Sequence, residues 1–141
     1  MRRPYTQLYC HAVWATEGRA HYITSAAEPR LHGAIRAKLN ELKCVPIAIG
    51  GMPDHVHCLF GFPPTVALSH VVQQIKGSSS HFATHELGLA EFAWQGAYGA
   101  FTVGREDLEA VQAYVLGQRA HHSENTVWPE FEKTFLEDEA M

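Results

Sequence analysis

The sequence is short of the features that mark several functional classes. Its three cysteines, Cys10, Cys44 and Cys58, are an odd number and lie far apart, so the chain offers neither a disulfide framework nor a Cys-x-x-Cys zinc site. It has no apolar run near the roughly 20 residues that cross a bilayer, and its N-terminal residues lack a signal-peptide core. We therefore expect a cytoplasmic protein without a membrane partner.

Excess positive charge and a phosphate-binding loop are missing as well. The 11 Lys and Arg residues are outnumbered by 15 Asp and Glu, and the formal charge of -4 argues against a general polyanion binder. The glycines Gly96 and Gly99 are too closely spaced for a phosphate-binding loop and lack the Lys-Ser/Thr that would follow. With 46% hydrophobic residues, the 141-residue chain is long enough for one compact domain, residues 1–141.

Hydrophobic periodicity predicts an α+β fold with the element order β-α-β-β-α-β, the ferredoxin-like (RRM-like) arrangement. The expected elements are a strand at 7–16, a helix at 25–43, a strand at 44–49 ended by two glycines, a strand that begins at 55, a helix at 66–85 and a short strand within 94–103. An added helix from Gly104 to about residue 125 carries Tyr114. A short acidic helix in 128–139, docked by Trp128, Phe131 and Phe135, is expected after it.

Two histidines, separated by a single residue, lie at the start of the third predicted strand. Because successive side chains of a strand point to opposite faces, His55 and His57 share one face, roughly 6.6 Å apart along the strand. They could chelate one divalent metal ion, which would need at least two more ligands and, in a catalytic site, an open position. The alternative is that one histidine packs in the core while the other faces solvent.

A tyrosine and a glutamine lie four residues apart in the helix predicted after the last strand. Tyr114 and Gln118 therefore present on one helix face, roughly 6 Å apart. The amide oxygen of Gln118 suits Mg²⁺ or Mn²⁺, and the phenol of Tyr114 could attack a phosphate whose charge is neutralised. The alternative places Tyr114 in the buried stripe of the helix and Gln118 at its edge.

Taken together, these motifs resemble those of a known family. The matching residues are Pro53-Asp54-His55-Val56-His57, Trp94-Gln95 with Tyr98-Gly99-Ala100-Phe101, and Tyr114-Val115 with Gln118, His121 and His122. Trp14, Thr16 and Arg19 in and after the first strand, and Lys76 with Ser78 and Ser79, match as well. In this order, and over nearly the whole chain, they look like the single-tyrosine HUH transposases of small bacterial insertion sequences, the IS200-like family. They are closest to its branch associated with repetitive extragenic palindromes.

The resemblance implies a metal-dependent endonuclease and strand transferase that acts on single-stranded DNA at hairpins formed by imperfect palindromes. By position, His55, His57 and Gln118 would hold the Mg²⁺ or Mn²⁺ ion. Tyr114 would attack the scissile phosphate and leave a 5′-phosphotyrosine and a free 3′-hydroxyl. Members of the family work as homodimers, and the resemblance implies that the tyrosine helix of one subunit serves the histidine pair of the other.

The predicted DNA contacts are basic and aromatic side chains. They are Arg19, Lys76, Trp94, Tyr98 and Arg119. Unpaired bases stack on aromatic rings with about 1–3 kcal/mol per base. Trp94 could equally pack in the core, and each basic residue could be an ordinary solvated charge. His121 and His122 match the family, but no role for them follows from the residues.

Three other functions fit parts of the sequence. A domesticated protein that binds hairpin DNA or acts in regulation could keep the fold without turnover, but it would not need the nucleophile Tyr114. A replication initiator or relaxase shares the paired histidines but usually has a longer chain and different surroundings for its tyrosine. A plain RNA-binding domain of this topology would leave His55 and His57 unexplained. The transposase is the prediction that uses the tyrosine and all three metal-binding residues.

Overall fold

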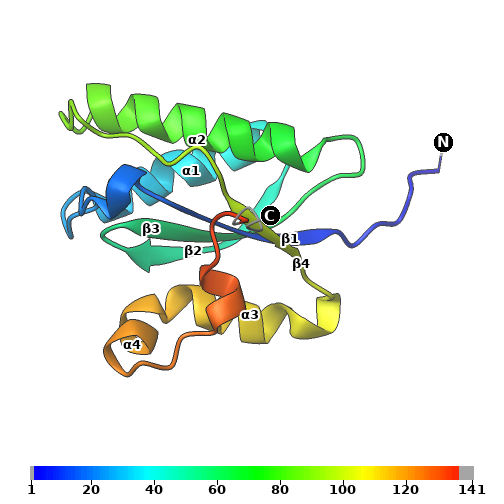
Figure 1. The fold of residues 1–141 in the computed structure, drawn as a ribbon. Helices are drawn as coiled ribbons and strands as arrows, with labels where there is room; N and C mark the ends of the chain where they lie inside the picture. Colours follow the sequence, from blue (N-terminus) through cyan, green and yellow to red (C-terminus); the bar gives the residue numbers. More distant parts are fainter. Residues whose placement is uncertain (1, 137–141) are drawn as a thin grey trace, which may run out of the picture.

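The structure, a computed structural model, describes residues 2–136, in which a four-stranded sheet is flanked by helices on both faces (Figure 1). The strands are β1 (Tyr9–Ala15), β2 (Val45–Met52), β3 (His55–Gly61) and β4 (Gly99–Thr102). The helices are α1 (Glu28–Glu41), α2 (Leu68–His85), α3 (Leu108–Leu116) and α4 (Gln118–Ser123), with 3-10 turns η1 (Glu17–Arg19), η2 (Arg105–Asp107) and η3 (Pro129–Glu132). Within the described residues, none of the helices is long and apolar enough to cross a membrane. The α+β class is as predicted.

The sheet is antiparallel throughout, with the strand order β2-β3-β1-β4. β2 and β3 form the hairpin expected from their short spacing, because Met52 pairs with His55 and only Pro53 and Asp54 lie between them. α1 and α2 cover one face of the sheet, while α3, α4 and η3 lie on the other (Figure 1). The turn of the hairpin thus places His55 at the first position of β3.

Successive side chains of each strand point to opposite faces of the sheet, and this divides the interior into two layers. Trp14, Cys58 and Phe60 are fully buried in the layer between the sheet and the helices α1 and α2. Leu59 points the other way and packs with Val115 of α3. The three cysteines are buried and free. Residues of β3 with odd numbers therefore face α3, and this parity determines the side on which the histidine pair lies.

The helix predicted from Gly104 to about residue 125 is interrupted. α3 ends at Leu116 and α4 begins at Gln118, with Gly117 between them at φ −95° and ψ 21°. Glycine is a weak helix former, so a break at this position needs little energy. Gln118 therefore starts a new helical segment, and its position relative to Tyr114 is decided by this junction.

The tail after α4 folds back over α3. Its described part contains only the 3-10 turn Pro129–Glu132, in place of the helix predicted in 128–139, of which residues 137–139 lie outside the described residues. Trp128 and Phe131 pack on Tyr114, with ring centroids 4.7 Å and 5.6 Å away. Phe135 is 55% exposed and does not dock as predicted. Two of the three predicted anchors therefore hold the tail against the tyrosine.

Candidate active site

The histidine pair of β3 is buried beneath α3 and the tail. His55 is 3% and His57 is 0% exposed, and their ring centroids lie 5.1 Å apart. Their intervening neighbour Val56 points into the layer formed with α1 and α2. The two imidazoles therefore share one face of the sheet, and neither is a solvent-facing surface histidine.

Each imidazole of the pair is held through its Nδ1 atom. His55 Nδ1 lies 2.8 Å from Asp54 Oδ1, and because a carboxylate only accepts, His55 donates this hydrogen bond. His57 Nδ1 lies 2.8 Å from Nε2 of His11, a fully buried residue of the neighbouring strand β1. Proteins commonly orient metal-binding histidines by such contacts to the second ring nitrogen. Asp54 and His11 thus leave the Nε2 atoms of the pair for other partners.

The chain after β4 brings Gln118 and Tyr114 to these Nε2 atoms. Gln118 Oε1 lies 3.2 Å from His55 Nε2, and the Gln118 amide donates to the carbonyl oxygen of Tyr114 at 3.2 Å. The ring of Tyr114 stands edge-on to that of His57, with centroids 5.8 Å apart. His55, His57, Tyr114 and Gln118, singled out from the sequence, therefore meet within one chain.

The close approach of α3 to the sheet depends on Gly50. This residue pairs with His57 across the β2–β3 hairpin, and a Cβ added to it would lie 2.0 Å from the backbone oxygen of Val115. In the sequence, Gly50 appeared only to end a strand, yet β2 continues through it to Met52. A side chain at Gly50 would push α3, and Tyr114 with it, away from the histidines.

A glutamate that the sequence did not single out lies in the middle of the site. Glu132, the last residue of η3, places Oε1 2.9 Å from His122 Nε2 and 3.3 Å from His55 Nε2. Its Oε2 lies 3.0 Å from His57 Nε2 and accepts the hydroxyl proton of Tyr114 at 2.7 Å. Glu132 could not be found from residue spacing, because it reaches the histidines only through the docking of the tail.

His122 and His11 were also missed as members of the site. His122 matched the family without a role, and its Nε2 lies 3.1 Å from Gln118 Oε1, beside the contact with Glu132. His11 gave one signal that could have been used, since a histidine in a strand with no other polar neighbour needs a buried partner. Both residues contact the predicted metal ligands, and neither belongs to the sequence motifs from which those ligands were predicted.

The hydroxyl of Tyr114 is enclosed in this arrangement. It donates to Glu132 and accepts the backbone N–H of Trp128 at 3.0 Å, and the indole of Trp128 stacks on the phenol ring. The side chain is 1% exposed. Burial, together with the neighbouring carboxylate, raises the pKa of Tyr114 to about 12. The phenol is therefore protonated at neutral pH, and residues 128–132 cover it.

Opposite charges face one another across the site. Burial alone would lower the pKa of His55, but the carboxylates of Asp54 and Glu132 outweigh it and raise this pKa to about 9. Burial opposes ionisation of Glu132, yet its contacts with His55 and the Tyr114 hydroxyl hold the pKa of this carboxyl well below its usual range. Burial lowers the pKa of His57, and that of His11 to about 3, so both are neutral at pH 7.

The atoms that converge here suit a divalent cation. Because His55 donates from Nδ1, its neutral form has a lone pair on Nε2. This lone pair would face the oxygen of Gln118, which is also an acceptor, unless a proton or a cation lay between the two atoms. His57 Nε2 is fully buried and makes no hydrogen bond with any described residue, although Glu132 Oε2 is 3.0 Å away. Imidazole nitrogens with amide and carboxylate oxygens bind first-row divalent metals, including Mn²⁺. The residues present therefore fit the predicted metal.

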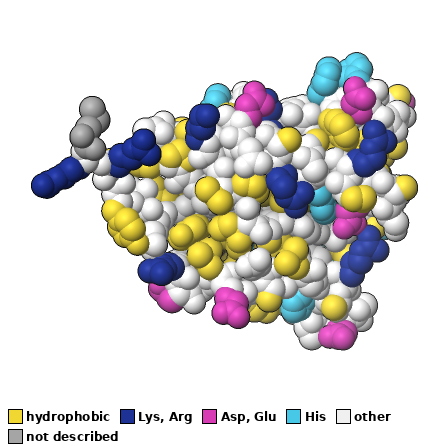
Figure 2. All heavy atoms as spheres, turned by 180° about the vertical axis from the view of Figure 1, so that it is seen from behind, with side chains coloured by type: hydrophobic (Ala, Val, Ile, Leu, Met, Phe, Trp, Pro, Cys, Tyr) yellow, Lys and Arg dark blue, Asp and Glu magenta, His cyan; other side chains and the backbone are white. Residues whose placement is uncertain are grey.

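Two of the predicted DNA contacts lie on the surface. Arg19 is exposed 3.6 Å from Asp54, the residue that holds His55, and the exposed Arg119 donates to Glu28 at 2.7 Å. On the face drawn in Figure 2, Lys and Arg side chains are spread among acidic ones and do not gather in one patch. On this face, the basic side chains are thus separate charges and form no continuous basic surface.

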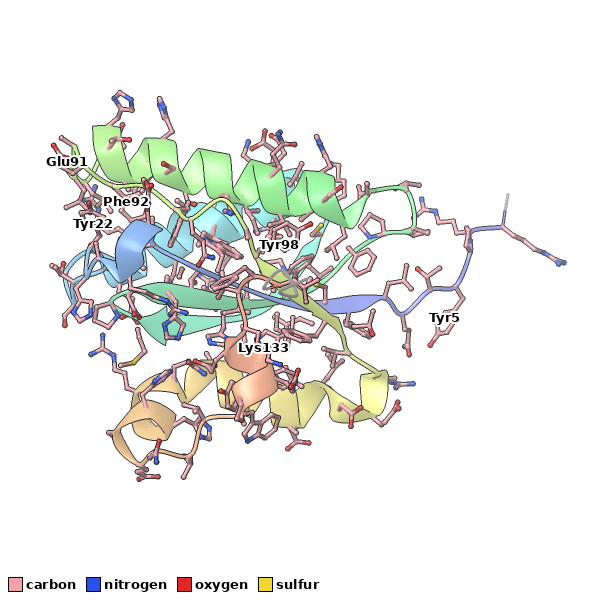
Figure 3. All side chains as sticks on the ribbon, in the orientation of Figure 1. Tyr5, Tyr22, Glu91, Phe92, Tyr98 and Lys133 are labelled. Atoms are coloured by element: carbon pink, nitrogen blue, oxygen red, sulfur yellow. The ribbon has the colours of Figure 1, made fainter. Side chains whose placement is uncertain are left out.

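The other three predicted contacts have partners inside the molecule. Lys76 donates to two backbone oxygens of the segment 95–97, at 2.7 Å and 3.0 Å. Its Nζ lies 6.0 Å from the ring centre of Tyr98, which is on the α2 side of the sheet (Figure 3). Trp94 donates to Ser79 Oγ at 2.9 Å and packs on the core, which agrees with the alternative considered for it.

Comparisons with known proteins agree on the kind of fold. The sequence profile of the family described as IS200-like transposases matches residues 4–118. A Deinococcus radiodurans protein described as a transposase is similar, with 24% identity, a TM-score of 0.66, and 82% of this chain and 93% of that one covered. The REP-associated tyrosine transposase bound to a REP hairpin is similar with 19% identity, a TM-score of 0.63, and coverage of 92% and 79%. Among curated protein sequences, none matches.

Proposed function

The chain belongs to the family of IS200-like transposases, and on this premise we propose that it is a metal-dependent enzyme that cleaves and rejoins single-stranded DNA at hairpins. The similar structure that holds a REP hairpin supports a hairpin as the DNA partner. The element order and the strand order β2-β3-β1-β4 support the ferredoxin-like description of the fold.

The observation that carries this proposal is that one carboxylate touches both halves of the site. Glu132 Oε2 lies 2.7 Å from the Tyr114 hydroxyl and 3.0 Å from His57 Nε2. A phosphodiester likewise carries one negative charge over two terminal oxygens, so a phosphate at this position would meet the tyrosine and the histidines together. The separation of nucleophile and histidines thus matches what an attack on phosphorus requires.

In the proposed reaction, the Tyr114 oxygen attacks the scissile phosphodiester. The bond between this oxygen and phosphorus forms, and the bond from phosphorus to the 3′ oxygen breaks. The phenol loses its proton and the departing 3′ oxygen gains one to become the 3′-hydroxyl, so the step balances. The product is a 5′-phosphotyrosine, whose bond energy allows a second 3′-hydroxyl to reverse the step. No nucleotide cofactor is needed for this exchange.

The residues of the pair and their neighbours prepare the site for this attack. His55, His57 and Gln118 would hold a Mg²⁺ or Mn²⁺ ion, which when bound polarises a phosphate and neutralises its charge. Asp54 and His11 keep the imidazoles in the orientation that turns Nε2 inwards. Because these contacts are made before DNA binds, the two imidazoles need little reorganisation for the reaction itself.

One movement must accompany DNA binding. Tyr114 is covered by Trp128 and bonded to Glu132, so residues 128–132 have to move aside before a phosphate can reach the hydroxyl. The tyrosine meets the histidines of its own chain, and we propose that each chain builds a complete site, in place of the shared sites that the resemblance implies. The homodimer itself stays a prediction.

The experiment is to detect the covalent intermediate. The protein is incubated with single-stranded DNA from the palindromic sequences that flank its coding region, together with Mn²⁺, and resolved on a denaturing gel. We expect a protein–DNA adduct that is absent with Tyr114→Phe, because only the nucleophilic oxygen is removed. Hairpin binding by this variant should stay close to wild type.

Tyr5→Phe is the matched control. Tyr5 lies on the N-terminal segment ahead of β1 (Figure 3) and is 83% exposed, so the same change there should leave the adduct intact. An adduct that persists in Tyr114→Phe would reject the assigned nucleophile. Hairpin binding without any adduct from the wild-type protein would instead support the regulatory DNA-binding protein.

A further inference from the structure

Glu132 contacts three imidazole nitrogens of the site. A carboxylate on a surface turn is normally solvated, and burying it costs free energy unless it finds charged or hydrogen-bonding partners. Glu132 is instead directed inwards, between His55, His57 and His122, with contacts from 2.9 to 3.3 Å. The sheet contributes two of these histidines and α4 the third, so the tail closes a cluster built by distant parts of the chain.

The spacing of these atoms is that of ligands around a common centre. Metal bonds to nitrogen and oxygen of about 2.1 Å put neighbouring ligand atoms about 3.0–3.4 Å apart in octahedral or tetrahedral sites. His55 Nε2 is 3.2 Å from Gln118 Oε1 and 3.3 Å from Glu132 Oε1, and His57 Nε2 is 3.0 Å from Glu132 Oε2. These separations lie close to the range expected of such ligands.

The direction of the His57 ring is a second observation. Its Nε2 is fully buried and makes no hydrogen bond with any residue in the described part of the chain, even though the Glu132 oxygen is within 3.0 Å. In the tautomer that donates from Nδ1 to His11, the lone pair of this nitrogen is therefore not aimed at the oxygen. Lone pairs that avoid each other at short distance are what ligands show when they point at one ion between them.

We propose that Glu132 is a ligand of the metal ion in the DNA-free protein, together with His55, His57 and Gln118. The inference rests on the proposed function, which assigns the ion to the last three. Glu132 adds the one negative charge of this set, and carboxylate ligands strengthen the binding of hard cations such as Mn²⁺ and Mg²⁺. His122, beside Glu132 Oε1 and Gln118 Oε1, keeps both oxygens in place.

The test measures Mn²⁺ binding by isothermal titration calorimetry on the full chain without DNA. Glu132→Gln should weaken Mn²⁺ binding by about 10- to 100-fold, a loss known even for residues that only support metal ligands. Glu130→Gln is the matched control, because Glu130 lies in the same 3-10 turn and pairs with Lys133 at 3.0 Å on the surface. The Mn²⁺ affinity of Glu130→Gln should equal that of the wild-type protein.

His57→Ala separates this inference from the proposed function. If His57→Ala abolishes Mn²⁺ binding and Glu132→Gln leaves it unchanged or tighter, Glu132 is no ligand and the inference is overturned, while the metal site stands. If His57→Ala also binds as wild type, the metal site of the proposed function is wrong. The visible absorption of bound Co²⁺ gives a second readout, since loss of a ligand changes its coordination. Should Glu132→Gln fail to fold, Glu132→Asp keeps the charge but shortens the reach, and undiminished binding by it would equally reject the inference.

Discussion

Replacing Gly50 by alanine tests whether the packing of α3 on β2 determines the geometry of the site. The added Cβ would lie 2.0 Å from the backbone oxygen of Val115 and 2.9 Å from its carbonyl carbon. Ordinary contact begins at 3.4 Å, so α3 must retreat by about 1.4 Å from the sheet. Because the obstacle is backbone, no rotation of a side chain relieves it.

The retreat would act on stability and on chemistry. Adding a methyl group to a closely packed interior costs about 1–3 kcal/mol of unfolding free energy. The displaced helix carries Tyr114, and a displacement of about 1 Å at a reacting group costs about 100-fold in rate. We therefore expect Gly50→Ala to lower stability by this amount and to slow adduct formation at least about 100-fold.

Urea unfolding and the rate of adduct formation on single-stranded DNA measure the two effects. Gly77→Ala is the control, since a Cβ there meets nothing within 4 Å and replaces a glycine inside α2, which should stabilise by about 0.5–1 kcal/mol. Wild-type stability and adduct rate in Gly50→Ala would refute the reasoning. A stability loss with an unchanged rate would show that the reaction does not depend on this contact.

Three further predictions concern other parts of the chain. Mixing Tyr114→Phe with His57→Ala chains, with exchange of chains verified, should restore no adduct, because both groups meet within one chain; recovery would place the tyrosine in the partner's site, as the resemblance implies. Burial lowers the pKa of His32 in the folded chain. Below about pH 6.5 the unfolded chain therefore binds a proton that the folded chain does not, so the unfolding free energy decreases as the pH is lowered. His32→Gln should flatten the decline in Tm between about pH 7 and pH 5, and an equally steep decline would contradict this. Lys76→Met should lower the unfolding free energy by about 1–3 kcal/mol through the loss of two hydrogen bonds to the segment 95–97, and an unchanged urea midpoint would argue against that role.

Local pattern was sufficient for most of the fold. Helical spacing placed α1 and α2 within a few residues, and the short segment Met52-Pro53-Asp54 before His55 predicted the β2–β3 hairpin, because both signals depend on neighbours in the chain. Period-two alternation likewise put His55 and His57 on one face. The helix after β4 was less predictable, since the break at Gly117 arises from the way α3 and α4 pack, and helical periodicity continues across it.

The residues of the site likewise fall into those that the sequence predicted and those that only the structure revealed. His55, His57, Tyr114 and Gln118 could be named from short motifs, because each motif is contained within five residues. Glu132 and His11 could not, since one reaches the histidines by the docking of the tail and the other across the ladder between β1 and β3. The sequence by itself determined which side chains share a strand face or a helical turn. Only the tertiary structure decided which of these faces meet, because that depends on the packing of α3 against Gly50 and of the tail against Tyr114.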